Sequence, residues 1–215
     1  MGGKQVDSSH YGFRGYVTEG RWSSLWHQLD EVARLGARRV LEIGPGPGLF
    51  RAIAARFGVA VETLDVDPEL RPDHVASATA IPLADGSYDL VCAFQVLEHL
   101  PYPDALRAFA EMARVSAGHV VISLPDARPA WRYVAHIPGL GTADRVVERP
   151  RLRAPAHRFD GEHHWEINAR GFALERVLRD LGARAELLRT YRVRAHLYHR
   201  FLVFAKRGTP AAGPR

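Results

Sequence analysis

The sequence predicts an α/β fold in which a largely parallel sheet carries helices on both faces. Four short apolar segments rich in β-branched residues are typical of buried strands: 38–44, 60–66, 87–94 and 119–125. Between them, residues 48–58 and 104–118 place apolar side chains three or four positions apart and end at a glycine, as amphipathic helices with a glycine C-cap do. Such alternation of strand and helix is typical of a parallel sheet.

Further elements are expected on either side of this core. We expect a short strand near 74–76, a helix near 169–181 and two closing strands at 183–193 and 198–207. Residues 18–36 are predicted to form a helix whose apolar stripe packs in the core: Trp22, Leu25, Trp26, Leu29, Val32 and Leu35.

The stretch 126–168 is rich in Arg, Pro and His and shows no clear periodicity. An unstructured connection of this length is uncommon in a compact domain unless it is functional, so we expect an irregular substrate lid.

Composition places the chain among ordinary globular proteins, with 47% apolar and 25% charged residues in 215. No apolar run approaches the roughly 20 residues that span a bilayer, and the first residues lack the apolar region of a signal peptide. The single cysteine, Cys92, lies in an apolar run and is expected to be buried, which favours the cytoplasm. The net charge of +5 would suit nucleic acid or an acidic small molecule, but no nucleic-acid motif accompanies it, which disfavours nucleic acid.

A glycine loop, GPGPG at 44–48, follows the first strand and precedes a helix. It is expected at the carboxyl edge of the sheet, where open α/β folds bind ligands, although small residues there also permit tight packing. Pro45 and Pro47 lack the N–H groups that a pyrophosphate needs, and Glu42 would repel a phosphate, so a nicotinamide dinucleotide is disfavoured. An acid beside glycines suits a ligand with an ammonium group and no phosphate, as in S-adenosylmethionine (SAM).

A second carboxylate supports a nucleoside ligand. Asp65 ends the next strand, where an acid can accept hydrogen bonds from both hydroxyls of a ribose. Asp67 precedes Pro68 and is expected to cap the following helical turn instead. The alternative for Asp65 is a strand-end acid that only stabilises a turn.

These motifs resemble those of class I SAM-dependent methyltransferases that act on small molecules. VLEIGPGPGLF is similar to their first motif, TLDVDPEL to their second, and ATAIPLADGSYDLVCAFQVLEHLPYPDALRAFAEMARV to the stretch from the adenine contact to the helix after the fourth strand. The resemblance covers roughly residues 38–125. It implies a Rossmann-like, doubly wound sheet of seven strands, mostly parallel with an antiparallel last strand, and SAM as the methyl donor.

The resemblance implies contacts along the whole cofactor. The methionine end would lie against Glu42, Gly44 and Gly46, with Phe94 and Gln95 beneath it. Asp65 would bind the ribose.

The adenine would lie against Val66, Ala78 and Thr79. Many relatives have an aspartate that accepts the adenine amino group, whereas this chain has Ser77, a weaker acceptor. This departure is the one cofactor feature that favours a non-catalytic SAM-binding scaffold or regulatory subunit.

Methyl transfer from a sulfonium depends largely on in-line positioning, although an oxygen or nitrogen acceptor can need a base. His99, in QVLEHLP, follows the fourth strand where family members often carry a polar active-site residue, and it is predicted to be catalytic. The alternative is a histidine that bonds the backbone at a helix start. Glu98 could support His99, be a solvated acid or belong to a metal site, but the sequence shows no complete ligand set, so no metal is predicted.

The segment FDGEHHWEINARGF, residues 159–172, is a second concentration of reactive side chains. The adjacent His163 and His164 point differently on any regular element, which disfavours a metal site built from this pair. One of them is predicted to face the acceptor as a catalytic residue. Asn168 could be the N-cap of the next helix.

The lid has an excess of arginine, which favours a carboxylate or phosphate on the acceptor, although a solvated surface is the alternative for any one of them. These arginines are Arg128, Arg132, Arg145, Arg149, Arg151, Arg153 and Arg158. Trp131, Tyr133 and Trp165 could stack on a flat acceptor or fasten the lid to the core.

We therefore expect a segment and helix at 1–36 covering the cofactor site, a methyltransferase domain at 37–207 with its lid at about 126–168, and a flexible tail at 208–215. The predicted function is SAM-dependent methylation of a small-molecule acceptor, acidic or aromatic, at oxygen, in a biosynthetic pathway. An RNA or protein acceptor is the alternative. No membrane partner is expected, and the sequence does not indicate an oligomeric state.

Overall fold

The computed structural model describes residues 14, 17–150, 154–157, 159 and 161–208. The first thirteen residues of the predicted N-terminal segment lie outside the described residues. So do Arg151, Arg153, Arg158 and the predicted tail beyond Gly208.

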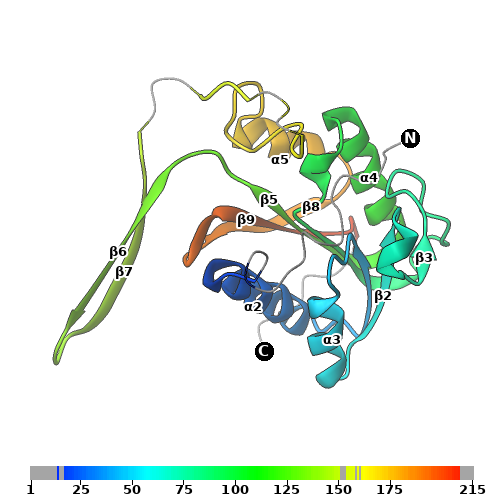
Figure 1. Ribbon diagram of the computed structural model, residues 1–215, viewed down its shortest axis with the longest axis horizontal. Coiled ribbons are helices and arrows are strands. Elements are labelled where there is room, and N and C mark those ends of the chain that lie inside the picture. Colours follow the sequence, from blue (N-terminus) through cyan, green and yellow to red (C-terminus); the bar gives the residue numbers. More distant parts are fainter. Residues whose placement is uncertain (1–13, 15–16, 151–153, 158, 160, 209–215) are drawn as a thin grey trace.

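The core is one seven-stranded sheet with helices on both faces (Figure 1). In sheet order its strands are β3 (His74–Val75), β2 (Ala60–Asp65), β1 (Arg39–Ile43), β4 (Tyr88–Phe94), β5 (Ser116–Pro125), β9 (His196–Ala205) and β8 (Glu186–Val193). Neighbours are parallel from β3 to β5, and β9 is antiparallel to both β5 and β8. The predicted fold class is therefore confirmed.

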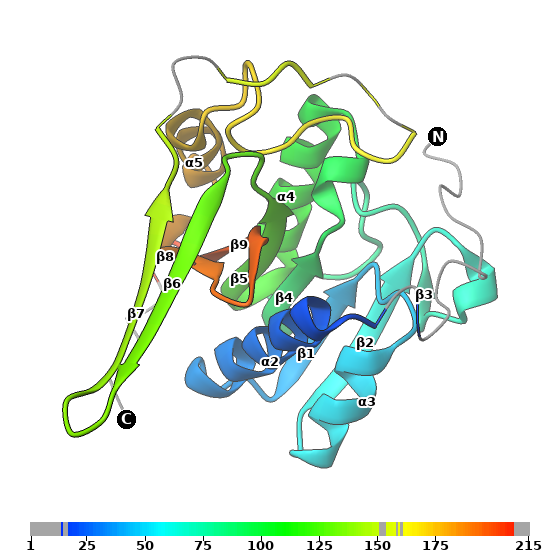
Figure 2. The same cartoon turned by 60° about the vertical axis from the view of Figure 1, so that its left-hand side comes forward.

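Two helices cover each face of the sheet (Figure 2): α2 (Glu19–Arg34) and α3 (Leu49–Arg56) on one, α4 (Tyr102–Val115) and α5 (Leu174–Gly182) on the other. Short 3-10 turns, η2 (Pro68–Leu70) and η3 (Leu97–His99), follow β2 and β4. As predicted, Asp67 caps the first of them, its carboxylate accepting from the N–H of Glu69 at 3.0 Å.

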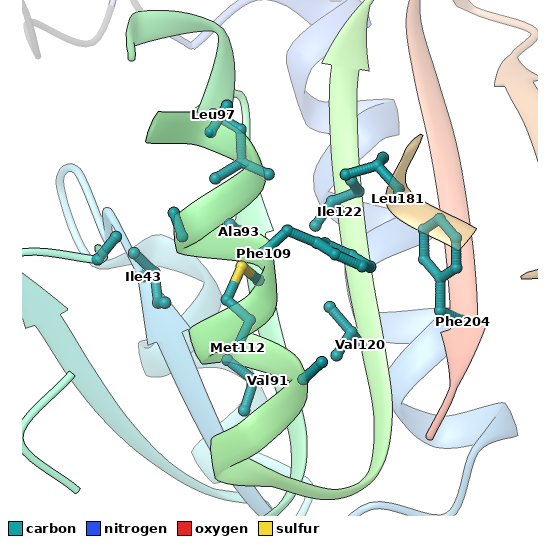
Figure 3. Close-up of a cluster of buried hydrophobic side chains, with 14 of the residues drawn as sticks. Ile43, Val91, Ala93, Leu97, Phe109, Met112, Val120, Ile122, Leu181 and Phe204 are labelled. Atoms are coloured by element: carbon teal, nitrogen blue, oxygen red, sulfur yellow. The ribbon is translucent and has the colours of Figure 1, made fainter. Parts of the chain in front are cut away.

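Apolar packing fixes these layers. On the α4 side, Phe109 and Met112 pack over the central strands against Val91, Val120 and Ile122 (Figure 3). Because β4 and β5 are covered on both faces, their sequences are nearly continuous apolar runs, and Cys92 is buried among them as expected.

The predicted apolar stripe of α2 is correct only in part. Leu25 and Val32 are buried in a cluster with apolar residues of β4 and β9. Trp22 and Trp26, in contrast, are 53% and 56% exposed. The stripe is wider than the surface that the sheet offers to this helix.

Two predicted helix boundaries are wrong. Helix α4 has no glycine C-cap: Ser116 is already extended and begins β5, so Gly118 lies inside that strand. Helix α5 begins at Leu174 with Ala173 as N-cap, and Asn168 has a positive φ of 63°. Asn168 lies before the helix in sequence but still hydrogen-bonds its first residue: the Asn168 side-chain oxygen accepts from the N–H of Leu174 at 3.3 Å.

The predicted irregular lid contains regular structure. Strands β6 (Ala130–Ile137) and β7 (Gly141–Glu148) pair antiparallel from Ala130↔Glu148 to Ile137↔Gly141. Figures 1 and 2 show this hairpin extending away from the sheet. The expectation of an irregular stretch is thus wrong for 130–148. Within the described residues, no helix is long and apolar enough to cross a membrane.

Candidate functional site

The carboxyl ends of β1, β2 and β4 meet at one edge of the sheet, where the glycine loop leaves β1. The N–H of Gly44 donates to the carbonyl of Leu64 at 2.9 Å, which ties the loop to β2. Gly44 has a φ of +69°, and a Cβ there would meet Val96 at 2.5 Å. Only glycine therefore allows the loop to turn tightly here and pass close to Val96, just after β4.

Glu42 lies at this turn with its carboxyl group almost completely buried. It is 4% exposed, and its Oε2 has no hydrogen-bond partner among the described residues. Burial raises the pKa of this carboxyl from 4.5 to about 8. A buried acid without a partner is expensive, and a cationic ligand group beside it would remove that penalty.

A cavity of about 580 Å³ opens above this edge. Its wall includes five of the residues assigned to the cofactor from sequence: Glu42, Gly44, Gly46, Phe94 and Gln95. Gln95 has a positive φ of 58°, and its side chain donates to Ser123 Oγ at 3.1 Å. The volume is in the range of small-molecule and cofactor sites.

The other five assigned residues lie outside that wall, at the neighbouring strand ends. Asp65 ends β2, where its Oδ1 accepts from the N–H of Asp67 at 2.9 Å and burial raises its pKa. Val66 is 44% exposed and Ala78 is buried. The hydroxyls of Ser77 and Thr79 bond each other at 2.8 Å, so Ser77 already has a local partner.

Two of the predicted catalytic histidines lie together in the cavity wall. The rings of His99, from η3, and His163 are 5.1 Å apart. His99 Nδ1 donates to the carbonyl of Glu162 at 2.9 Å, and His163 Nδ1 lies 3.0 Å from Glu166 Oε1. These contacts assign the Nδ1 proton on both rings, so that in the neutral imidazole Nε2 carries the lone pair.

His164 does not line this cavity. Its ring stacks on Phe159 with centroids 4.3 Å apart, and its backbone N–H donates to the carbonyl of Glu98 at 2.8 Å. The expectation that the two adjacent histidines point differently is correct, and His163 is the one beside the cavity.

The same wall has residues that the sequence did not indicate. Helix α2 contributes Arg21, Trp22 and Gln28, and β9 contributes His196, Tyr198 and His199. Ser24 Oγ lies 2.8 Å from His199 Nδ1, and burial lowers the pKa of His199 to about 2, so this ring is neutral. The sequence contains no signal for these residues beyond the expectation that the helix within 1–36 covers the cofactor site, because the exposure of Trp22 is visible only in the structure.

Tyr198 also lines a second cavity, of about 480 Å³, at the base of the β6–β7 hairpin. Its hydroxyl donates to Glu166 Oε1 at 2.5 Å, the same oxygen that His163 contacts. Of the lid arginines within the described residues, Arg128 lines this smaller cavity and none lines the larger one.

Glu98, His99 and His163 also form a set of potential metal ligands, with ligand atoms within 4.8 Å of one another. Glu98 is fully buried, neither oxygen has a hydrogen-bond partner, and burial raises its pKa to about 8. The sequence showed no complete ligand set because His163 is distant in the chain from the other two. Glu and His side chains suit a divalent transition-metal ion.

Comparison with known proteins now identifies the family. A methyltransferase-domain family matches residues 18–187, which is most of the chain. The chain belongs to this methyltransferase family. The family expected from the sequence motifs is therefore confirmed.

Relatives of this methyltransferase extend the match. An uncharacterized methyltransferase of Mycobacterium sp. (strain JLS) is 36% identical over 118 residues, covering 49% of this chain and 45% of that protein. The chain thus matches less than half the length of this relative. A ubiquinone biosynthesis O-methyltransferase of Xanthomonas euvesicatoria is 27% identical over 187 residues, covering 77% of this chain and 73% of its own.

A solved SAM-dependent methyltransferase from Mesorhizobium loti has the same fold, with a TM-score of 0.56 at 19% identity over 91% of this chain and 100% of that chain.

The aromatic residues expected in the lid have different positions. Trp165 is buried and its Nε1 donates to the carbonyls of Leu97 and Leu100 at 3.3 and 3.2 Å. Trp165 therefore fastens the end of the lid to η3, while Trp131 and Tyr133 are exposed on the hairpin.

Proposed function

We propose that this methyltransferase transfers the methyl group of SAM to an oxygen of a small-molecule acceptor in a biosynthetic pathway. The observation that carries the proposal is Glu42, a buried carboxyl group whose Oε2 has no hydrogen-bond partner among the described residues, in the wall of a cavity bounded by the glycine loop. The ammonium group of SAM is the cation that would compensate this acid.

The ten residues assigned from the sequence supply the remaining contacts of this proposal. Glu42, Gly44 and Gly46 hold the methionine end, with Phe94 and Gln95 beside it in the same wall. Asp65, at the end of the strand next to β1, accepts from the ribose hydroxyls. Val66, Ser77, Ala78 and Thr79 border the adenine.

His99 and His163 prepare the acceptor in this proposal. Both rings keep their proton on Nδ1, so Nε2 of either can remove the proton of an acceptor hydroxyl. Glu166 fixes the orientation of His163, and Tyr198 in turn holds Glu166. The sulfonium of SAM supplies an already activated methyl group, so the chain's main task is to orient the acceptor.

The other wall residues indicate what the acceptor looks like. Trp22 offers an exposed ring on which a flat molecule could stack, and Arg21 lines the same wall. We infer an aromatic acceptor with a hydroxyl group. The relative named as an O-methyltransferase supports oxygen as the methylated atom, and the single buried cysteine supports the cytoplasm.

The test is methyl transfer from labelled SAM to a panel of catechols and hydroxybenzoates, measured as a function of pH. We expect the double variant His99→Ala with His163→Ala to reduce turnover by about a hundredfold while SAM affinity is kept. The two single variants show which of the rings is the base. His164→Ala is the matched control, because this ring lies outside the cavity wall, and its turnover should stay within a few-fold of wild type.

Unchanged turnover in the double variant His99→Ala with His163→Ala would refute base catalysis and leave positioning of the acceptor as the only role of the site. Labelling of RNA or protein but not of the phenolic panel would favour the alternative acceptor class. SAM binding without transfer to any of these would favour a non-catalytic scaffold.

A further inference from the structure

The β6–β7 hairpin has two chemically different faces. Residues paired across an antiparallel ribbon share a face, and alternate residues point to opposite faces. The register from Ala130↔Glu148 to Ile137↔Gly141 therefore separates an inner face from an outer one. We define the outer face as Trp131, Tyr133, Ala135, Ile137, Gly141, Ala143, Arg145 and Val147.

Ion pairs attach the inner face to the body of the protein. Asp144 pairs with Arg194 in the β8–β9 connection at 2.9 Å, and Glu148 pairs with Arg200 of β9 at 3.1 Å. On β7, Asp144, Val146 and Glu148 are accordingly partly shielded, whereas the alternate residues Ala143, Arg145 and Val147 are exposed. On β6 the side chains of both faces are exposed from residue 131 to 137. Both acids of β7 thus point inward, and the outer face points away from the sheet.

The outer face is apolar, exposed and basic. Trp131, Tyr133, Ile137 and Val147 are 48%, 58%, 51% and 46% exposed, and Leu140 at the hairpin tip is 84% exposed. Arg149 continues this face, since its guanidinium lies 5.9 Å from the ring centre of Trp131. Among the described residues, the outer face has two arginines with Arg149 included, and no acid.

A two-stranded ribbon with an uncovered apolar face is marginally stable in water, so a partner surface is expected. A second copy of this face would bring arginines against arginines with no acid to compensate. Aromatic rings and arginines are side chains that settle at a lipid–water interface, and anionic headgroups complement the arginines.

We propose that the outer face of the β6–β7 hairpin docks onto an anionic lipid membrane. Trp131 and Tyr133 enter the headgroup region, Leu140 and Ile137 at the tip reach the acyl boundary, and Arg145 and Arg149 contact lipid phosphates. The docking is peripheral, through one ribbon face. It does not rest on the identity of the methyl acceptor.

Co-sedimentation with vesicles tests this proposal. Full-length protein should sediment with phosphatidylcholine vesicles that contain phosphatidylserine and remain in the supernatant with phosphatidylcholine alone. Arg145→Gln with Arg149→Gln should weaken binding by at least about tenfold, since each basic residue near an anionic surface contributes several-fold. The double variant Trp131→Ser with Ile137→Ser should abolish vesicle binding.

The matched control removes the same charge elsewhere: Arg56→Gln with Arg184→Gln, two exposed arginines outside the hairpin, at the end of α3 and after α5. This variant should bind within about twofold of wild type, and thermal unfolding of every variant should match wild type because the hairpin lies outside the core. Failure to bind anionic vesicles, or equal binding by both arginine pairs, would overturn the proposal. So would a dimer by light scattering that Trp131→Ser with Ile137→Ser dissociates, since a second copy would then cover the face.

Discussion

Replacement of Glu42 by glutamine should make the ligand-free protein more stable and the cofactor complex weaker. The pKa of the buried carboxyl is raised from 4.5 to about 8. A carboxyl group whose pKa is raised by folding stabilises the folded protein fully below pH 4.5, where it is protonated in both the folded and the unfolded state. This stabilisation is lost progressively as the pH rises from 4.5 to about 8. Glutamine does not ionise, so the stability of Glu42→Gln does not fall with pH for this reason.

The magnitude follows from the pKa change. At 1.36 kcal/mol for each pH unit, the wild-type protein has lost roughly 3 kcal/mol by about pH 7 relative to a protein without this acid. The free energy of unfolding of Glu42→Gln should therefore exceed that of wild type by roughly 3 kcal/mol near neutral pH and match it near pH 4.5. The amide cannot neutralise an ammonium group, so SAM affinity should fall by about ten- to a hundredfold.

Urea unfolding at several pH values and calorimetric titration with SAM measure the two effects separately. Glu98→Gln is the matched control: burial also raises the pKa of Glu98 to about 8, but Glu98 is not in the cavity wall. It should show the same pH-dependent gain in stability and keep SAM affinity. If Glu42→Gln bound SAM as tightly as wild type, the assignment of Glu42 to the ammonium group would be wrong.

Three further outcomes test the site and the fold. Gly44→Ala should lower the free energy of unfolding by about 1–3 kcal/mol and impair SAM binding, because the φ of this residue is +69° and the added Cβ would strike Val96. Gly36→Ala is the control: this residue has a φ of +66° but open space around it, so the variant should bind SAM normally. Asp126→Ala should reduce stability by about 3–5 kcal/mol in chemical denaturation, since it removes the buried acid of Arg192 and Arg200 and leaves them only the more exposed Glu148. Asp144→Ala, at a surface pair, should change stability by under about 1 kcal/mol. Calorimetric titration with Zn²⁺ or Mn²⁺ separates base catalysis from metal-assisted binding. Base catalysis by Nε2 predicts no heat, whereas one site that Glu98→Gln and His163→Ala remove and His164→Ala keeps would place an ion on Glu98, His99 and His163.

The cofactor side of the site was accessible from sequence because its determinants are local. Glu42, the glycine loop and Asp65 lie at the ends of two strands whose apolar patterns are unambiguous, and parallel strands bring those ends to one edge. The antiparallel last strand was implied by the family resemblance and not by periodicity.

The acceptor side was not accessible because distant segments form it. Ser24 and His199 are 175 positions apart and still lie 2.8 Å from each other, which only the packing of α2 on β9 explains. The hairpin at 130–148 was missed because the residues of both faces include arginines and apolar side chains, so strand alternation is hard to recognise. Trp22 and Trp26 were predicted to be core residues but are exposed. Helical spacing shows which side chains share one face of a helix, but not whether another element covers that face.

The central claim, that the cavity beside Glu42 holds SAM, is tested most directly by calorimetric titration of the purified protein with SAM, its demethylated product and NAD. We predict one site for SAM and for the product, weakened at least about tenfold in Glu42→Gln, and no binding of NAD. Binding of NAD without SAM, or SAM binding that Glu42→Gln leaves unchanged, would contradict the claim.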